Sequence, residues 1–214
     1  MIKEKRKVNK MKFLAAFSLS CLIFISGILI GSQLTKMKVS DILSIEKESR
    51  IQLENLQLEE YFLEEEICQS PKLLTESLDE LGTKLGYLES QYSKDDSRII
   101  DLKKPYSLLE IRHYLAMKRR AERCNSNDSL ILFFYSNDPE YIDESEQQGF
   151  ILDYLKKKYD NVRVYSFDGN LELGILNLLK EKYNISIYPS TVIEGRVYAG
   201  LHDKTEFEEV IKNN

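Results

Sequence analysis

Ser186–Leu201 reads Ser-Ile-Tyr-Pro-Ser-Thr-Val-Ile-Glu-Gly-Arg-Val-Tyr-Ala-Gly-Leu, which has the pattern of a short β-hairpin. A run rich in β-branched residues is entered through Tyr188-Pro189, a turn follows at Glu194-Gly195, and a second run ends at Gly200. The stretch therefore predicts two antiparallel strands that form one edge of a sheet.

The residues before and after this hairpin alternate between strand and helix patterns. A continuous apolar run is typical of a central strand that is covered on both faces, and a strand, a helix and a second strand imply a parallel pair. The expected elements are a strand at 129–136, a helix to about Tyr159, a strand at 162–167, a helix at 171–183, the hairpin, and a last helix that begins at the capping box Asp203 with Glu206. The predicted order is β-α-β-α-β-β-α.

This order and the run Tyr188-Pro189-Ser190-Thr191 resemble the thioredoxin-like family over roughly residues 125–214. The resemblance implies an α/β domain with a cis peptide bond before Pro189. In that family the backbone before the proline pairs with an extended substrate, so Tyr188 and Pro189 are implied as peptide-binding residues, with Tyr135 and Tyr141 as neighbours. A cis-proline that serves only as a turn is the alternative.

Redox-active members of the family carry Cys-x-x-Cys at the start of the first helix, and this chain has no cysteine anywhere in 125–214. Ser145 stands in the corresponding region, but a serine without a base cannot exchange disulfides. Acidic neighbours such as Asp143 and Glu144 would also raise the pKa of a thiol there. We therefore predict no catalytic residue, and three scattered cysteines with two histidines predict neither a metal site nor a cofactor.

The region before this domain is predicted to be helical. Residues 38–92 are expected to form a stalk of two helices, with a break at Ser70-Pro71, which is a helix-start signal. The second helix carries a coiled-coil seam that needs a partner surface, and this predicts that the two helices form a hairpin. The seam consists of Leu74, Leu78, Leu81, Leu85, Leu88 and Tyr92. Its partner is the helix before it or, as the alternative, a second copy in a homodimer.

Residues 93–104 are expected to be a linker. Residues 105–124 are expected to form a helix that leads into the domain, and its inward residues are Leu108, Ile111, Leu115 and Ala116. His113 in this helix is interpreted as a surface or packed residue.

The N-terminus carries the pattern of a membrane anchor. Residues 1–12 contain six Lys or Arg against Glu4, and residues 13–31 are apolar and long enough to span a bilayer. A cleaved signal peptide is the alternative, but small residues are poorly placed for cleavage. The basic residues before the span predict a cytoplasmic tail at 1–12 and a C-terminal domain outside the cytoplasm of a single-pass cell-membrane protein.

An oxidising compartment would allow Cys68 and Cys124 to form a disulfide, which would contribute about 4 kcal/mol by closing a long loop. Two unrelated cysteines are the alternative. The formal charge of −5 includes +5 in residues 1–12, so the rest of the chain is acidic and nucleic acid is not an expected partner.

Together these observations predict a membrane-anchored, redox-inactive thioredoxin-like protein that binds or scaffolds a polypeptide or membrane protein, and not an enzyme. The first alternative is a thiol-disulfide oxidoreductase, or a divergent copy of one, that uses Cys68 and Cys124. A second is an oligomerising coiled coil with a passive cap.

Overall fold

The computed structural model describes residues 11–31, 47, 51, 54–55, 68, 72–92 and 96–212, with the backbone alone at 72–74. Residues 1–44 and 45–214 form two units, and each is described by itself. Most of the basic tail and of the first stalk helix, 38–68, lies outside the described residues.

One described helix is long and apolar enough to cross a membrane. It spans Met11–Gly31, with a mean hydropathy of 2.5, and it includes the predicted span 13–31. The hydroxyls of Ser20 and Ser26 donate to the carbonyls of Ala16 and Leu22, so both polar groups are satisfied within the helix. A membrane anchor and a signal sequence share these properties.

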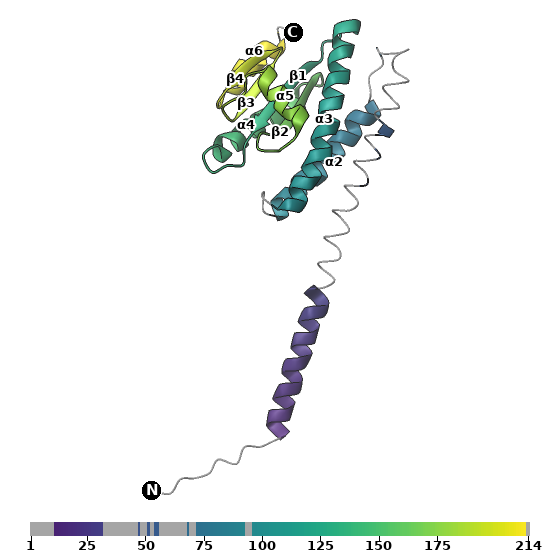
Figure 1. Cartoon of the computed structure of the whole chain (residues 1–214), viewed down its shortest axis with the longest axis vertical. Coiled ribbons are helices and arrows are strands. Elements are labelled where there is room, and N and C mark those ends of the chain that lie inside the picture. The colour runs from purple at the N-terminus through teal and green to yellow at the C-terminus, as the bar shows by residue number, and fades with distance from the viewer. Residues whose placement is uncertain are drawn as a thin grey trace. The chain divides into compact units, whose positions relative to one another are not determined.

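The second unit contains a four-stranded sheet in the order β2-β1-β3-β4 (Figure 1). Its elements are α2 Lys72–Gln91, α3 Ser97–Cys124, β1 Ser129–Tyr135, α4 Ile142–Lys158, β2 Val162–Asp168, α5 Gly174–Lys182, β3 Ser190–Ile193, β4 Arg196–Ala199 and α6 Lys204–Lys212. Strands β1 and β2 are parallel, whereas β3 is antiparallel to both β1 and β4. The mixed α/β class and the predicted order of strands and helices from β1 onward are confirmed.

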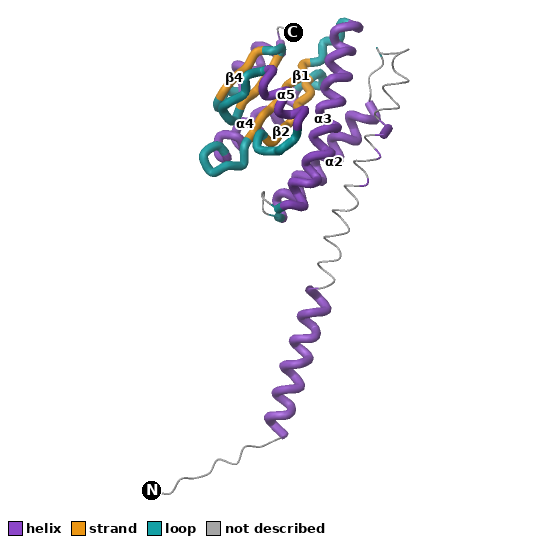
Figure 2. Tube along the Cα trace, viewed as in Figure 1, coloured by secondary structure: helices purple, strands orange, loops and turns teal. Residues whose placement is uncertain are grey.

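Helices cover both faces of the sheet (Figure 2). Leu132 and Phe134 of β1 pack with buried residues of α3 and α5. Ile131 and Phe133 point to the other face, where α4 and α6 supply the partners. Because both faces are covered, β1 is apolar along nearly its whole length.

Helix α3 begins at Ser97, so residues 97–104 are helical and are not the expected linker. Asp96 caps the helix by accepting the Arg98 N–H at 3.0 Å, and Pro105 lies inside it. The burial of Ile99 and Leu102 gives this first part of the helix a stabilising apolar face. The inward face also differs from the expected one, because Leu115 is 41% exposed. The buried apolar residues beyond Pro105 are Leu109, Ile111, Tyr114 and Met117.

Helix α2 pairs with α3, and Figure 1 shows the two side by side. Thr75 contacts His113 and Glu89 contacts Lys103, so the two helices run antiparallel. The four central leucines of the predicted seam, Leu78, Leu81, Leu85 and Leu88, are buried. Within the described residues the helix that pairs with α2 is α3. The stalk helix at 38–68, with which the seam is expected to pair, lies mostly outside them.

Candidate functional site

The predicted peptide-binding residues lie where β3 begins, beside the carboxyl end of β1. The Tyr188-Pro189 peptide bond is cis, and Ser190 pairs with Phe134 in the sheet. Pro189 is buried, Tyr188 is partly buried, and Ile187 is 50% exposed.

The ring of Tyr188 is held between two loops. Its hydroxyl donates to the carbonyl of Gly169 at 3.3 Å, and a Cβ atom on Gly169 would fall 2.2 Å from the ring. The ring of Tyr141 packs against it edge to face, with centroids 5.8 Å apart. The structure therefore brings Tyr141 to Tyr188, whereas Tyr135 packs against Phe133.

The backbone groups of Tyr188 differ from those of its neighbours in their hydrogen bonding. Within the described residues, the carbonyl of Ile187 accepts the Ser190 hydroxyl and the carbonyl of Pro189 accepts the Gly200 N–H, but no hydrogen bond uses the N–H or C=O of Tyr188. Strand addition uses backbone N–H and C=O groups that have no partner within the fold, and the side chain of Ile187 beside them is half-exposed.

Polar side chains occupy the loop where the family places its cysteines. The hydroxyl of Ser145 accepts the N–H of Ser136 at 3.2 Å, and the hydroxyl of Ser136 accepts the N–H of Asp138. Asn137 donates to Asp168 at the end of β2. Ser145 is therefore buried and anchors this loop.

The disulfide between Cys68 and Cys124 is formed, with Cα atoms 5.5 Å apart. Cys124 ends α3 shortly before β1, whereas Pro189 lies near the carboxyl end of β1. A strand of seven residues is about 20 Å long, so the disulfide and the cis-proline lie at opposite ends of this strand. Cys124 therefore does not approach the region of the missing Cys-x-x-Cys.

His113 is packed in the interior. Its Nδ1 lies 2.8 Å from the Tyr165 hydroxyl and its Nε2 lies 3.1 Å from the Thr75 hydroxyl. Burial lowers the pKa of His113 to about 4. The ring is thus a neutral bridge between α2, α3 and β2.

Sequence reasoning missed a group of buried charges between the helix pair and the sheet. Lys103 of α3 contacts Glu89 at 2.7 Å and Asp168 at 2.8 Å. Burial opposes the charged form of Lys103, but the two carboxylates outweigh it and raise its pKa. Lys103 was missed because residues 93–104 were assigned to a linker. Had they been assigned to a helix, Lys103 would have been predicted on the buried face with Ile99 and Leu102.

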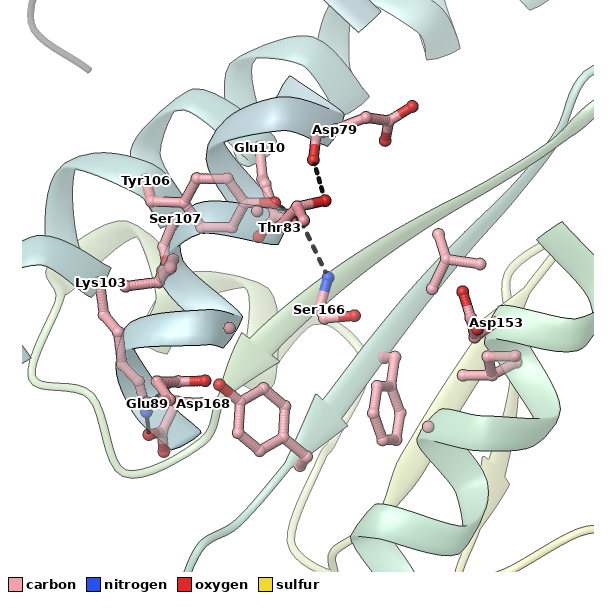
Figure 3. Close-up of a pocket in the computed structure, with 18 of the residues that line it drawn as sticks. Asp79, Thr83, Glu89, Lys103, Tyr106, Ser107, Glu110, Asp153, Ser166 and Asp168 are labelled. Atoms are coloured by element: carbon pink, nitrogen blue, oxygen red, sulfur yellow. Dashed lines mark hydrogen bonds and ion pairs between the residues drawn. The ribbon is translucent and has the colours of Figure 1, made fainter. Parts of the chain in front are cut away.

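A cavity of about 330 Å³ lies beside this group (Figure 3). Residues of α2, α3, β1, β2 and α4 line it, including Lys103, Tyr106, Glu110 and Asp168. Figure 3 shows a hydrogen bond between Glu110 and the backbone of Ser166. The N–H of Ser166 donates to Oε1 of Glu110 at 3.2 Å.

The strand order, the parallel pair and the helices on both faces give the second unit the arrangement expected of a thioredoxin-like fold. No family model and no curated protein matches the chain. Among solved structures, chloroplastic thioredoxin z is 15% identical, with 45% of this chain and 87% of that chain covered and a TM-score of 0.34. The oxidized form of mitochondrial thioredoxin 3 from Saccharomyces cerevisiae is 18% identical, with 46% and 90% covered and a TM-score of 0.33.

Proposed function

We propose that this chain is a single-pass membrane protein whose thioredoxin-like domain binds polypeptide outside the cytoplasm without thiol chemistry. The observation that carries the proposal is the main chain of Tyr188, which forms no hydrogen bond within the described residues. It lies beside half-exposed Ile187, in a region (125–214) that has no cysteine. The apolar helix Met11–Gly31 supports the anchor, and the Lys and Arg residues before it support a cytoplasmic N-terminus.

An extended segment of the partner would pair with the N–H and C=O of Tyr188. Backbone pairing supplies affinity for any sequence, and the side chains of Ile187 and Tyr141 would select an apolar neighbour. The contact of Tyr188 with Gly169 holds this edge in place before the partner arrives, which lowers the entropy lost on binding.

Site-specific photo-crosslinking tests the proposal. Ile187 is replaced by p-benzoylphenylalanine in the full chain, in its own membrane, and Phe150, which is 73% exposed on α4, is replaced in a matched control. We expect a polypeptide adduct from position 187 and none from position 150. Equal labelling from both positions would contradict binding at Tyr188.

The oxidoreductase alternative rests on one observation, which is that Cys68 and Cys124 are close enough to bond. A disulfide-exchange assay on the full chain in detergent micelles separates the two functions. Turnover that Cys124→Ser abolishes would favour the oxidoreductase and sink a binding-only function. We expect no turnover, because no second thiol pair lies at the cis-proline.

A homodimer through the stalk remains a proposal, with a constraint from the fold. The central leucines of the seam are already covered inside the chain. A dimer would therefore have to use other surfaces.

A further inference from the structure

The cavity between α2, α3, the sheet and α4 has the size of a small-molecule site. Its 330 Å³ falls at the lower end of the range of about 300–1,000 Å³ that is typical of ligand pockets. Asp79, Asp153 and Lys156 stand partly exposed at its rim, and Lys156 contacts Asp79 across it at 2.5 Å. Phe133, Leu152 and Val164 give its wall an apolar part.

Carboxylates outnumber ammonium groups along the lining. The acids are Asp79, Glu89, Glu110, Asp153 and Asp168, and the bases are Lys103 and Lys156. Lys103 is shared by Glu89 and Asp168, and Lys156 pairs with Asp79. Asp153 at the rim pairs with Lys157. Among the described residues, Glu110 is the lining acid that forms no ion pair.

Glu110 is also incompletely hydrogen-bonded. It is 4% exposed, and its Oε1 accepts the Ser166 N–H at 3.2 Å and the Tyr106 hydroxyl at 3.4 Å. Its Oε2 is buried without a partner. Burial raises the pKa of Glu110 to about 8, although both hydrogen bonds oppose the rise. A buried acid that lacks a cation and one hydrogen bond is costly, and a ligand that supplies both would remove the cost.

We propose that this cavity binds a ligand with an alkyl-ammonium or alkyl-guanidinium group, whose N–H groups donate to Glu110 and whose charge pairs with it. The alkyl chain of such a ligand would lie against the apolar wall. The cation can belong to a free small amine or to a Lys or Arg side chain of a polypeptide. The ligand site at Glu110 does not depend on polypeptide binding at Tyr188, and it would stand if that binding were disproved.

Other titratable groups near Glu110 come from every element around it. They are Asp79 and Glu89 of α2, Lys103, Tyr106 and His113 of α3, Tyr135 of β1, Arg163, Tyr165 and Asp168 of β2, and Asp153 and Lys156 of α4. His113, with its pKa lowered to about 4 by burial, stays neutral at pH 6 and above. Burial raises the pKa values of the three tyrosines, so they also stay neutral up to pH 9. A change in affinity between pH 6 and pH 9 would therefore report on Glu110.

The test uses calorimetry on the full chain in nonionic micelles, with n-butylguanidinium as the probe and n-butylurea as its uncharged isostere. We expect butylguanidinium to bind at least tenfold more tightly than butylurea. Because a guanidinium stays charged throughout, its affinity should rise by up to about 100-fold from pH 6 to pH 9 as Glu110 ionises. Glu110→Gln should abolish this pH dependence, and Glu172→Gln, at an exposed position, should leave it unchanged.

A second variant protects the test against misfolding of Glu110→Gln. Lys156→Gln removes the ammonium at the rim, so we expect tighter binding of butylguanidinium. Equal affinities for butylguanidinium and butylurea, no detectable binding of either, or undiminished binding to a folded Glu110→Gln protein would overturn the proposal. Acetyl-Gly-Arg-Gly-amide distinguishes the two sources of the cation, since tighter binding than that of butylguanidinium indicates a polypeptide side chain.

Discussion

Glu110 is a carboxylate whose environment favours its neutral form. Folding removes it from water, and the N–H of Ser166 and the hydroxyl of Tyr106 compensate one oxygen alone. The folded-state pKa of about 8 lies above the ordinary value of 4.5. Between these two pH values, Glu110 is therefore protonated in the folded chain and ionised in the unfolded chain.

This difference makes stability depend on pH through Glu110. The contribution of the group is fully present below pH 4.5 and is lost progressively as the pH rises to about 8. We expect the free energy of unfolding to fall more between pH 5 and pH 8 in the natural protein than in Glu110→Gln. The difference between the two falls should be several kcal/mol. Denaturant unfolding of the full chain in micelles, followed by circular dichroism, measures this. Parallel curves for the two proteins would show that Glu110 ionises normally.

Gly169 is the second residue on which the site depends. A methyl group there would meet the ring of Tyr188, which lies too close for a Cβ atom. We expect Gly169→Ala to cost about 1–3 kcal/mol, as other overpacked positions do, and to displace Tyr188. The cost should largely disappear when Tyr188→Ala is made in the same chain, and a double-mutant cycle of unfolding free energies measures it. Additive effects of the two substitutions would mean that the ring does not occupy this space.

At the scale of elements, the pairing of α2 with α3 decides which surfaces remain free. Leu81 is 1% exposed and is covered within a single chain. We expect Leu81→Ala to lower the unfolding free energy by about 2–5 kcal/mol, and the unfolding midpoint to be the same at tenfold different protein concentrations. A midpoint that rises with concentration would indicate that the leucines pack against a second copy.

The sequence allowed the strands and the order of elements along the chain from β1 onward to be predicted, because strand and turn signals are local. The hairpin at 190–199 and the apolar run of β1 need no knowledge of distant residues. The start of α3 could not be predicted in the same way. Pro105 and the acidic pair before Ser97 resemble a break, and the burial of Ile99 and Leu102 is a tertiary effect.

The residues of the candidate sites also differ in whether a sequence signal reveals them. Tyr188 and Pro189 could be singled out as candidates only because the run Tyr188-Pro189-Ser190-Thr191 resembles the thioredoxin-like family. Glu206, expected to close a capping box, contacts His202 instead, while Asp203 caps α6 through the N–H of Thr205. Glu110 carries no local signal, since an acidic residue on a helix ordinarily faces solvent, and the edge of β2 buries it.

At the scale of the whole molecule, the disulfide and the apolar helix make one consistent prediction about location. Cys68 and Cys124 are 56 positions apart, so closing this loop should contribute about 4 kcal/mol in the chain-entropy model. We expect both to be oxidised in isolated membranes and the unfolding midpoint to fall on reduction. Alkylation before and after reduction, read by mass, counts the thiols, with free Cys21 as the internal standard. Three free thiols before reduction would contradict an extracytoplasmic domain.

Photo-crosslinking from position 187 in the native membrane shows whether the main chain beside Pro189 binds polypeptide without thiol chemistry. We expect an adduct with a polypeptide from position 187, none from position 150, and a weaker adduct when Gly169→Ala displaces Tyr188. Adducts from both positions, or an adduct at 187 that Gly169→Ala leaves unchanged, would contradict this binding.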